Sequence, residues 1–306
     1  MIDFRYHIVS IVAAFLALAV GIVLGSTALR GPVLANLSGN VGKLTTENQN
    51  LRKQVRVLQG RTDSQGTFAA TVAPALLGGR LAGQDVDVVS MPGTGAGQRA
   101  AVVGLLGKAG AHVPAQIQLR SAFTDPRRGA EIRDLVAQLL PPGAQIPETS
   151  DAVAQESALL ADVLAKPAHG APTSPATRSS VLGGFHEIGV LTVDRPVTAP
   201  ADLVVVIAGG GAHRRSPAGR AAAVPLVTQL HRSFAGVVVA GPAADSDLVG
   251  AVRADAHLAK SVSTVDNLDT SAGQVGTVLA LAGERTGKVG AYGTGDGATL
   301  VPPLTR

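Results

Sequence analysis

The chain contains no cysteine among its 306 residues. Disulfide bonds, thiolate zinc sites and cysteine nucleophiles are therefore excluded. Soft metal ions prefer thiolate and thioether ligands, and methionine is also scarce, with only Met91 besides Met1. The absence of cysteine does not fix the compartment, because an exported protein does not require disulfides.

Aromatic residues and charges are also sparse. Phe, Tyr and Trp make up 3% of the chain, and charged residues make up 16%, with a net charge of +4. Proteins that bind nucleic acid concentrate Lys and Arg in dense basic stripes, and no such stripe is present, so this partner is not expected. Hydrophobic residues make up 46% of the chain, which is enough to bury the core of one large domain or two modest ones.

Common catalytic motifs are absent as well. The sequence has neither G-x-S-x-G nor H-E-x-x-H, and nothing argues for an enzyme or a catalytic residue. No two histidines lie within four residues of each other, so no single helix or strand supplies a pair of metal ligands. We therefore expect neither a metal site nor a cofactor. The histidines are His7, His112, His169, His186, His213, His231 and His257.

One long apolar run lies near the N-terminus. Residues 8–29 read IVSIVAAFLALAVGIVLGSTAL and contain no charge. About 20 apolar residues suffice to cross a bilayer, so the run predicts one transmembrane helix after a short tail at residues 1–7. A cleavable signal peptide is the alternative, although its apolar segment is usually shorter. Arg5 and the N-terminal amine lie on one side of the run, and Arg30 and Lys43 lie close on the other, so the positive-inside rule is nearly balanced. It weakly favours a single-pass protein of the cytoplasmic membrane with its bulk outside the cytoplasm.

A heptad pattern follows this run. Between residues 33 and 59, apolar side chains recur at alternating spacings of three and four, which predicts a coiled coil. Valine at a and leucine at d favour a parallel dimer with a second copy, although a partner's helix is also compatible. Asn48 occupies one a position, where it selects the dimer and fixes its register at a cost in stability. The predicted interface comprises Val41, Leu44, Asn48, Leu51, Val55 and Leu58, flanked by Glu47 at g and Arg52 at e.

The coil is expected to end at Gly60, because glycine is a natural helix C-cap. The alternative is a single amphipathic helix that lies on the protein's own domain, but its apolar stripe would usually be broader than a and d alone.

Residues 60–306 alternate short apolar runs with helical stretches. This alternation predicts an extracytoplasmic α/β domain with a Rossmann-like, doubly wound parallel sheet. Residues 167–180, PAHGAPTSPATRSS, predict an exposed loop, and Ser216-Pro217 predicts the start of a helix. The expected strands are 86–89, 117–119, 203–208, 237–240 and 261–265, and the expected helices are 98–109, 127–139, 151–164, 245–255 and 270–282.

Two glycine-rich turns follow predicted strands. The turn at Gly209-Gly210-Gly211 has Arg214 where a dinucleotide-binding fingerprint needs glycine, and the turn at residues 93–97 fails the same pattern. Tight turns in a glycine-rich protein are the simpler interpretation.

A further candidate site is the segment Asp266-Asn267-Leu268-Asp269-Thr270, which joins a predicted strand to a helix. Open α/β sheets place ligand sites at such positions. Asp269 or Thr270 is equally suited to cap the helix, and Asp266 to form a turn. The candidate ligand or partner site comprises Asp266, Asn267, Asp269, Gly209 and Gly211.

The chain resembles the MctB-like copper transporter family of bacterial envelope proteins, which includes SteB-like cell-separation proteins. The resemblance rests on FRYHIVSIVAAFLALAVGIVLGS at residues 4–26, on the heptads after it, and on STVDNLDTSAGQVGTVLAL at residues 263–281. It implies a membrane anchor and one of two activities. The first is pore-forming copper efflux. The second is partnership with a SteA-like protein and an NlpC/P60-type wall hydrolase.

The residues favour the second activity. A single helix cannot enclose a pore without oligomerising, and this one carries no charged residue to line a channel. Gly21 and Gly25 form a small-xxx-small face suited to close helix pairing. We therefore expect a dimeric scaffold or regulator in cell separation, with copper transport as the alternative.

Overall fold

The structure is a computed structural model of the 306-residue chain, and it describes residues 4–167, 172–209, 222–242 and 247–303. For residues 4–5, 26–41 and 247 only the backbone is described. The chain divides into two units, Met1–Ser64 and Gln65–Arg306. Each unit is treated by itself below.

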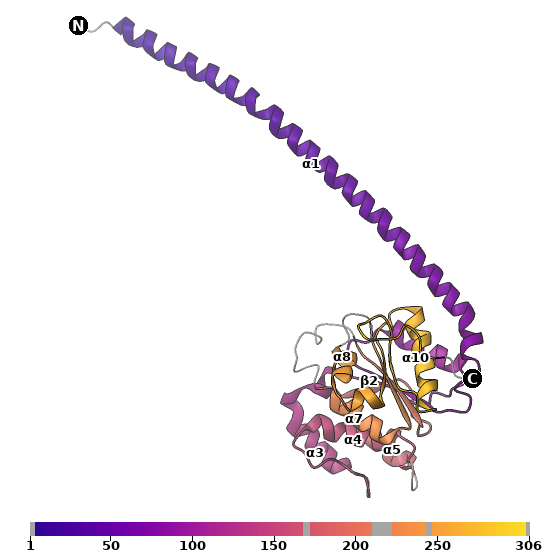
Figure 1. Cartoon of the computed structure of the whole chain (residues 1–306). Helices are drawn as coiled ribbons and strands as arrows, with labels where there is room; N and C mark the ends of the chain where they lie inside the picture. The colour runs from indigo at the N-terminus through magenta and orange to yellow at the C-terminus, as the bar shows by residue number, and fades with distance from the viewer. Residues whose placement is uncertain (1–3, 168–171, 210–221, 243–246, 304–306) are drawn as a thin grey trace. The chain divides into compact units, whose positions relative to one another are not determined.

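The first unit is helical, and its helix continues into the second. Helix α1 runs from Phe4 to Leu77 without interruption, shown from indigo to purple in Figure 1. It contains the apolar run and the heptads. Within the described residues, the stretch Tyr6–Gly25 is long and apolar enough to cross a membrane, with a mean hydropathy of 2.8. The single apolar helix that the uncharged run near the N-terminus predicts is therefore confirmed.

The prediction that Gly60 caps this helix is wrong. A glycine in a helix interior costs only about 1 kcal/mol relative to alanine, so a favourable continuation overrides it. Here the last turns of α1 carry Ala73 and Leu77, which are fully buried in the α/β unit. The helix ends at Leu77, after which Gly79 adopts a left-handed φ of 74°. Glycine takes this conformation without a steric penalty, so the stop signal lies at Gly79.

The second unit contains one seven-stranded sheet in the order β3-β2-β1-β4-β5-β6-β7. All neighbouring pairs are parallel except β2 and β3, which are antiparallel. The strands β1, β4 and β5 are buried along their whole length, which explains their runs of valine. The strands are β1 Val86–Ser90, β2 Gln116–Leu119, β3 Leu191–Val193, β4 Leu203–Ile207, β5 Gly236–Ala240, β6 Ser263–Val265 and β7 Ala291–Tyr292.

Helices cover both faces of this sheet (Figure 1). One apolar core joins the sheet to α3 Gly129–Leu139, α4 Ala152–Leu164, α5 Pro175–Glu187, α7 Val224–Ser233, α8 Asp247–Ala254 and α9 Leu258–Ser261. The other joins the sheet to α2 Ala96–Lys108, α10 Ser271–Glu284 and the last turns of α1. Two short 3-10 helices, Ser121–Thr124 and Pro126–Arg128, precede α3. The predicted α/β class with a mostly parallel sheet is confirmed.

Part of the predicted loop at 167–180 is helical instead. Helix α5 begins at Pro175, and the Ser174 side chain caps it by accepting a hydrogen bond from the Thr177 backbone N–H at 3.1 Å. A serine followed by proline at the first helical position is a helix start, so the same residues that suggested a loop specify a helix here. The helix start predicted at Ser216-Pro217 lies outside the described residues.

Candidate functional site

The sheet changes direction of winding between β1 and β4, where open α/β sheets usually bind ligands. In this chain the two turns that follow these strands contact each other directly. The hydroxyl of Thr94 lies 2.8 Å from the Met91 carbonyl and 3.2 Å from the Ile207 carbonyl, so it ties the turns together. A Cβ on Gly209 would overlap the carbonyl oxygen of Pro92. Among the described residues, the two turns are therefore in direct contact at this point of the sheet.

Of the predicted site residues, Gly209 therefore serves close backbone packing. Gly211 lies outside the described residues.

Asp266 is a structural brace in this fold. Its carboxylate accepts hydrogen bonds from Arg253 Nη1 at 2.7 Å and from the backbone N–H groups of Thr294 at 2.7 Å and Gly295 at 2.9 Å. Burial raises the pKa of Asp266, but the hydrogen bonds from Thr294, Arg253 and Gly295 outweigh it and hold the pKa below its usual value. A Cβ on Gly293 would overlap this carboxylate. Asp266 thus fixes the loop after β7, and its oxygens face protein donors.

The rest of this segment forms the start of α10. Thr270 is the N-cap, because its hydroxyl accepts a hydrogen bond from the Gly273 N–H at 3.0 Å. The capping interpretation is therefore confirmed for Thr270. Asn267 is buried, and its Oδ1 has no hydrogen-bond partner among the described residues, whereas Asp269 lies on the surface.

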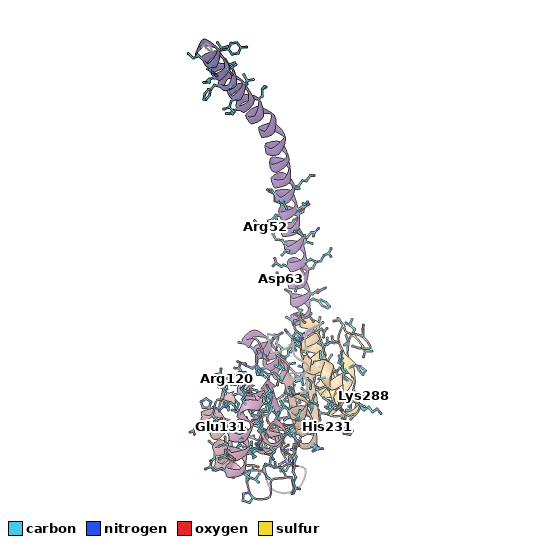
Figure 2. The ribbon with its side chains drawn as sticks, turned by 90° about the vertical axis from the view of Figure 1, so that its left-hand side faces the viewer. Arg52, Asp63, Arg120, Glu131, His231 and Lys288 are labelled. Atoms are coloured by element: carbon cyan, nitrogen blue, oxygen red, sulfur yellow. The ribbon has the colours of Figure 1, made fainter. Side chains whose placement is uncertain are left out.

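The predicted coil residues form an exposed stripe on α1. In the single chain the d-position side chains of Leu44, Leu51 and Leu58 are 64%, 60% and 58% exposed, and Val55 at a is 51% exposed. Asn48, Glu47 and Arg52 are exposed as well, and Figure 2 shows Arg52 projecting from this helix. The side chain of Val41 lies outside the described residues. The stripe therefore has the spacing and the exposure that a coiled-coil seam requires.

Two carboxylates are buried in the α/β unit, a feature that the sequence analysis missed. Asp87 on β1 and Glu156 on α4 are fully buried, and no oxygen of either has a hydrogen-bond partner among the described residues. Burial raises the pKa of Asp87 well above its usual value, although the nearby backbone of Ala115 and the charge of Arg178 oppose this. Burial raises the pKa of Glu156 to about 9. Glu156 is thus protonated at neutral pH, and burial shifts Asp87 towards its protonated form, since an unpaired buried charge is costly.

Comparison with known proteins gives the chain a family. The family described as "Copper transport outer membrane protein, MctB" matches residues 1–303. The chain belongs to the MctB family. Curated relatives named "Copper transporter MctB" from Mycobacterium tuberculosis (strain ATCC 25618 / H37Rv) and Mycobacterium bovis are each 32% identical to it, and one from Mycobacterium leprae is 30% identical. Each alignment covers 98% of this chain and 99% of the relative.

Because relatives in the MctB family are named as copper transporters, the placement of side chains that can bind metal ions bears on function. Among the described residues, no group of three or more His, Cys, Asp or Glu side chains could hold a metal ion. One pair of imidazoles does come together, because the rings of His231 and His257 have centroids 6.4 Å apart. Burial and the nearby His257 lower the pKa of His231.

This pair had no signal in the sequence. His231 lies in the last turn of α7, and His257 lies directly before α9, with β5 and α8 between them in the chain. Only the winding of the fold brings them together. Their meeting gives this MctB-family protein one pair of ligands that imidazole-binding metals could use.

Proposed function

We propose that the chain takes part in copper transport as a membrane-anchored subunit of an oligomer. The observation that supports this most is the extent of the family match. Relatives named as copper transporters align with 98% of the chain, which includes the apolar span, the heptads and the α/β unit. The proposal assigns no catalytic step to the chain.

The oligomer is required by the anchor. The apolar stretch Tyr6–Gly25 forms one helix and contains no Asp, Glu, Lys or Arg. One helix has no lumen, and without a charged residue it offers an ion no favourable lining, so several copies must assemble around any path. The exposed heptad stripe supplies the means, as a parallel dimer with Asn48 at the seam. Tethering to one membrane raises the local concentration of the two strands and helps so short a coil.

The proposed location is the cytoplasmic membrane, with a single pass and a Rossmann-like domain outside the cytoplasm. The family description names an outer membrane. An apolar helix of 20 residues is nevertheless the usual element that crosses a bilayer of ordinary hydrocarbon thickness. The strand order, with its reversal between β1 and β4, supports the Rossmann-like assignment of the domain.

A second candidate function is that of an envelope scaffold or regulator in cell separation, acting with a SteA-like protein and an NlpC/P60-type hydrolase. Two observations favour it. The apolar span offers no polar lining, and the described residues contain no cluster of three metal ligands. An anchored dimer that presents an α/β surface to a partner needs neither feature.

One experiment separates the two functions. A deletion strain is scored in the same culture for intracellular copper and for chained, unseparated cells. It is complemented with the wild type, with Val55→Lys at an a position of the heptad, and with Val57→Lys at the outward c position. The two valines are 51% and 50% exposed in the single chain, so they differ mainly in their place in the heptad.

Raised copper that the wild type and Val57→Lys correct, and that Val55→Lys does not, supports transport by an oligomer. Chained cells with normal copper overturn the transport proposal and support the scaffold.

A further inference from the structure

The two imidazoles of His231 and His257 are held by separate elements at the same edge of the sheet. His231 belongs to the end of α7, which leads into β5, and His257 precedes α9, which leads into β6. Both positions therefore lie near the amino ends of parallel strands, away from the braced loop at Asp266. Figure 2 labels His231 in this unit. The ring centroids lie 6.4 Å apart, and the ring planes make an angle of 70°.

This separation lies at the upper limit for two imidazoles that bind one metal ion. A ring nitrogen lies about 1.2 Å from its centroid and about 2.0 Å from a bound transition metal, so two imidazoles on one ion have centroids up to about 6.4 Å apart. The upper limit corresponds to a nearly linear arrangement of nitrogen, metal and nitrogen. Small rotations of either side chain shorten the distance and give a bent arrangement, with water in the remaining positions.

The nitrogens of both rings are open to a ligand. Neither imidazole forms a hydrogen bond with another residue in the part of the chain that the structure describes. His231 is half-buried and His257 is exposed, so an ion can approach from solvent. The backbone N–H of His257 donates to the Asp255 carboxylate at 2.9 Å, which fixes the turn that carries the ring and places a negative charge beside it. A cation therefore meets two imidazole rings and a nearby carboxylate.

We propose that His231 and His257 together bind a copper ion in an exchangeable site. Imidazole is a good ligand for copper, and among first-row divalent ions a given nitrogen site binds Cu²⁺ most tightly. Structural metal sites normally use four protein ligands, so a pair with water in the remaining positions holds its ion weakly and releases it. Such a balance suits transport, in which an ion must be able to leave. The choice of copper over other ions rests on the proposed function.

The test uses the full-length protein in detergent, titrated with Cu²⁺ alone. We expect one copper ion per chain, with an electron paramagnetic resonance signal that shows two imidazole nitrogens. His231→Gln and His257→Gln each weaken this binding tenfold or more, and each leaves one imidazole in the signal. His112→Gln is the matched control, because His112 also lies on the surface with a carboxylate close by, 2.8 Å from Asp85. It leaves both readouts unchanged.

Binding that is equal in the wild type and in both variants would overturn the site, as would an equal loss in His112→Gln. The double variant His231→Gln/His257→Gln is also returned to the deletion strain. Restored copper levels without copper binding in vitro would keep the transport proposal and remove the pair from it. Binding in vitro without a copper phenotype in the deletion strain would keep the site and remove the transport proposal.

Discussion

The guanidinium of Arg253 lies 2.7 Å from the carboxylate of Asp266, and the same guanidinium donates to Thr264 Oγ1 at 2.9 Å and to the Tyr292 carbonyl at 2.9 Å. One arginine therefore joins α8 to β6 and to β7. The carboxylate in turn holds the loop at residues 293–295. This arrangement gives a structural reason for the aspartate in the STVDN segment.

Replacing this carboxylate should destabilise the α/β unit. Asp266→Asn removes the charge that faces Arg253, and leaving a partly buried charge unpaired costs about 3 kcal/mol. We expect a clear fall in the midpoint of thermal unfolding of the full chain. Asp296→Asn, an exposed residue in the same loop, is the control and should leave the midpoint unchanged. An equal effect of the two substitutions would contradict the brace.

The buried Glu156 predicts a dependence of stability on pH. Its pKa is about 9 in the folded chain, against an unperturbed value of 4.5, so between these values the folded state binds more protons than the unfolded state. The free energy of unfolding therefore falls as pH rises from about 4.5 to about 9, by at most about 1.4 kcal/mol per pH unit. We expect Glu156→Gln to reduce this slope and to be more stable than the wild type at pH 9.

Denaturant unfolding at pH 5, 7 and 9 measures this slope. Glu148→Gln, at an exposed position, is the control and should leave the slope as in the wild type. A wild-type stability that rises between pH 5 and pH 9 in step with that of Glu156→Gln would contradict the role of Glu156.

The closed turns between β1 and β4 predict a strict need for glycine at residue 209. Gly209→Ala places a methyl group on the Pro92 carbonyl, and backbone must move to accommodate it. We expect a loss of about 2–4 kcal/mol in the free energy of unfolding. The loss comes from overpacking and from breaking the hydrogen bond between the Thr94 hydroxyl and the Ile207 carbonyl. Gly107→Ala in α2 meets nothing within 4 Å and should instead stabilise the protein by about 0.5–1 kcal/mol. Opposite signs for the two substitutions in urea unfolding would bear out this expectation.

The absence of cysteine allows a direct test of the coil. Leu51→Cys at a d position should form a disulfide with a second copy when membranes that contain the protein are treated with a mild oxidant. The reason is that d side chains meet across the interface of a parallel coiled coil. Val57→Cys at the outward c position should remain largely monomeric under the same conditions. Non-reducing gel electrophoresis reports the outcome. Equal cross-linking of both variants would point to random collision in the membrane.

Sequence periodicity predicted those parts of the fold in which burial is uniform. The run from Leu203 to Ile207 is buried on both faces, and a run of apolar residues bounded by glycine is what such a strand requires. The strands at Leu191–Val193 and Ala291–Tyr292 are three and two residues long, too short to show any period. Local rules also identified the cap at Thr270.

The remainder of the candidate site depends on long-range contacts. Nothing near Asp266 in the sequence indicates that Arg253 and the loop at residues 293–295 satisfy its oxygens. The meeting of His231 and His257 likewise follows from the order of strands β5 and β6, which only the folded sheet determines. Asp87 interrupts the otherwise apolar strand VDVVS, but the sequence near it does not predict that its side chain is buried. That burial depends on helices that lie far away in the sequence.

The short outer strands of the sheet have a further consequence for how copies of this protein can associate. An edge strand with unpaired backbone groups is a template for adding strands from another molecule, and it promotes aggregation when it is long and flat. Here the outer strands β3 and β7 have three and two residues, which offer too few backbone groups for such growth. High local density at a membrane surface therefore need not lead to intermolecular β-sheet formation, and ordered pairing is left to the helical stripe.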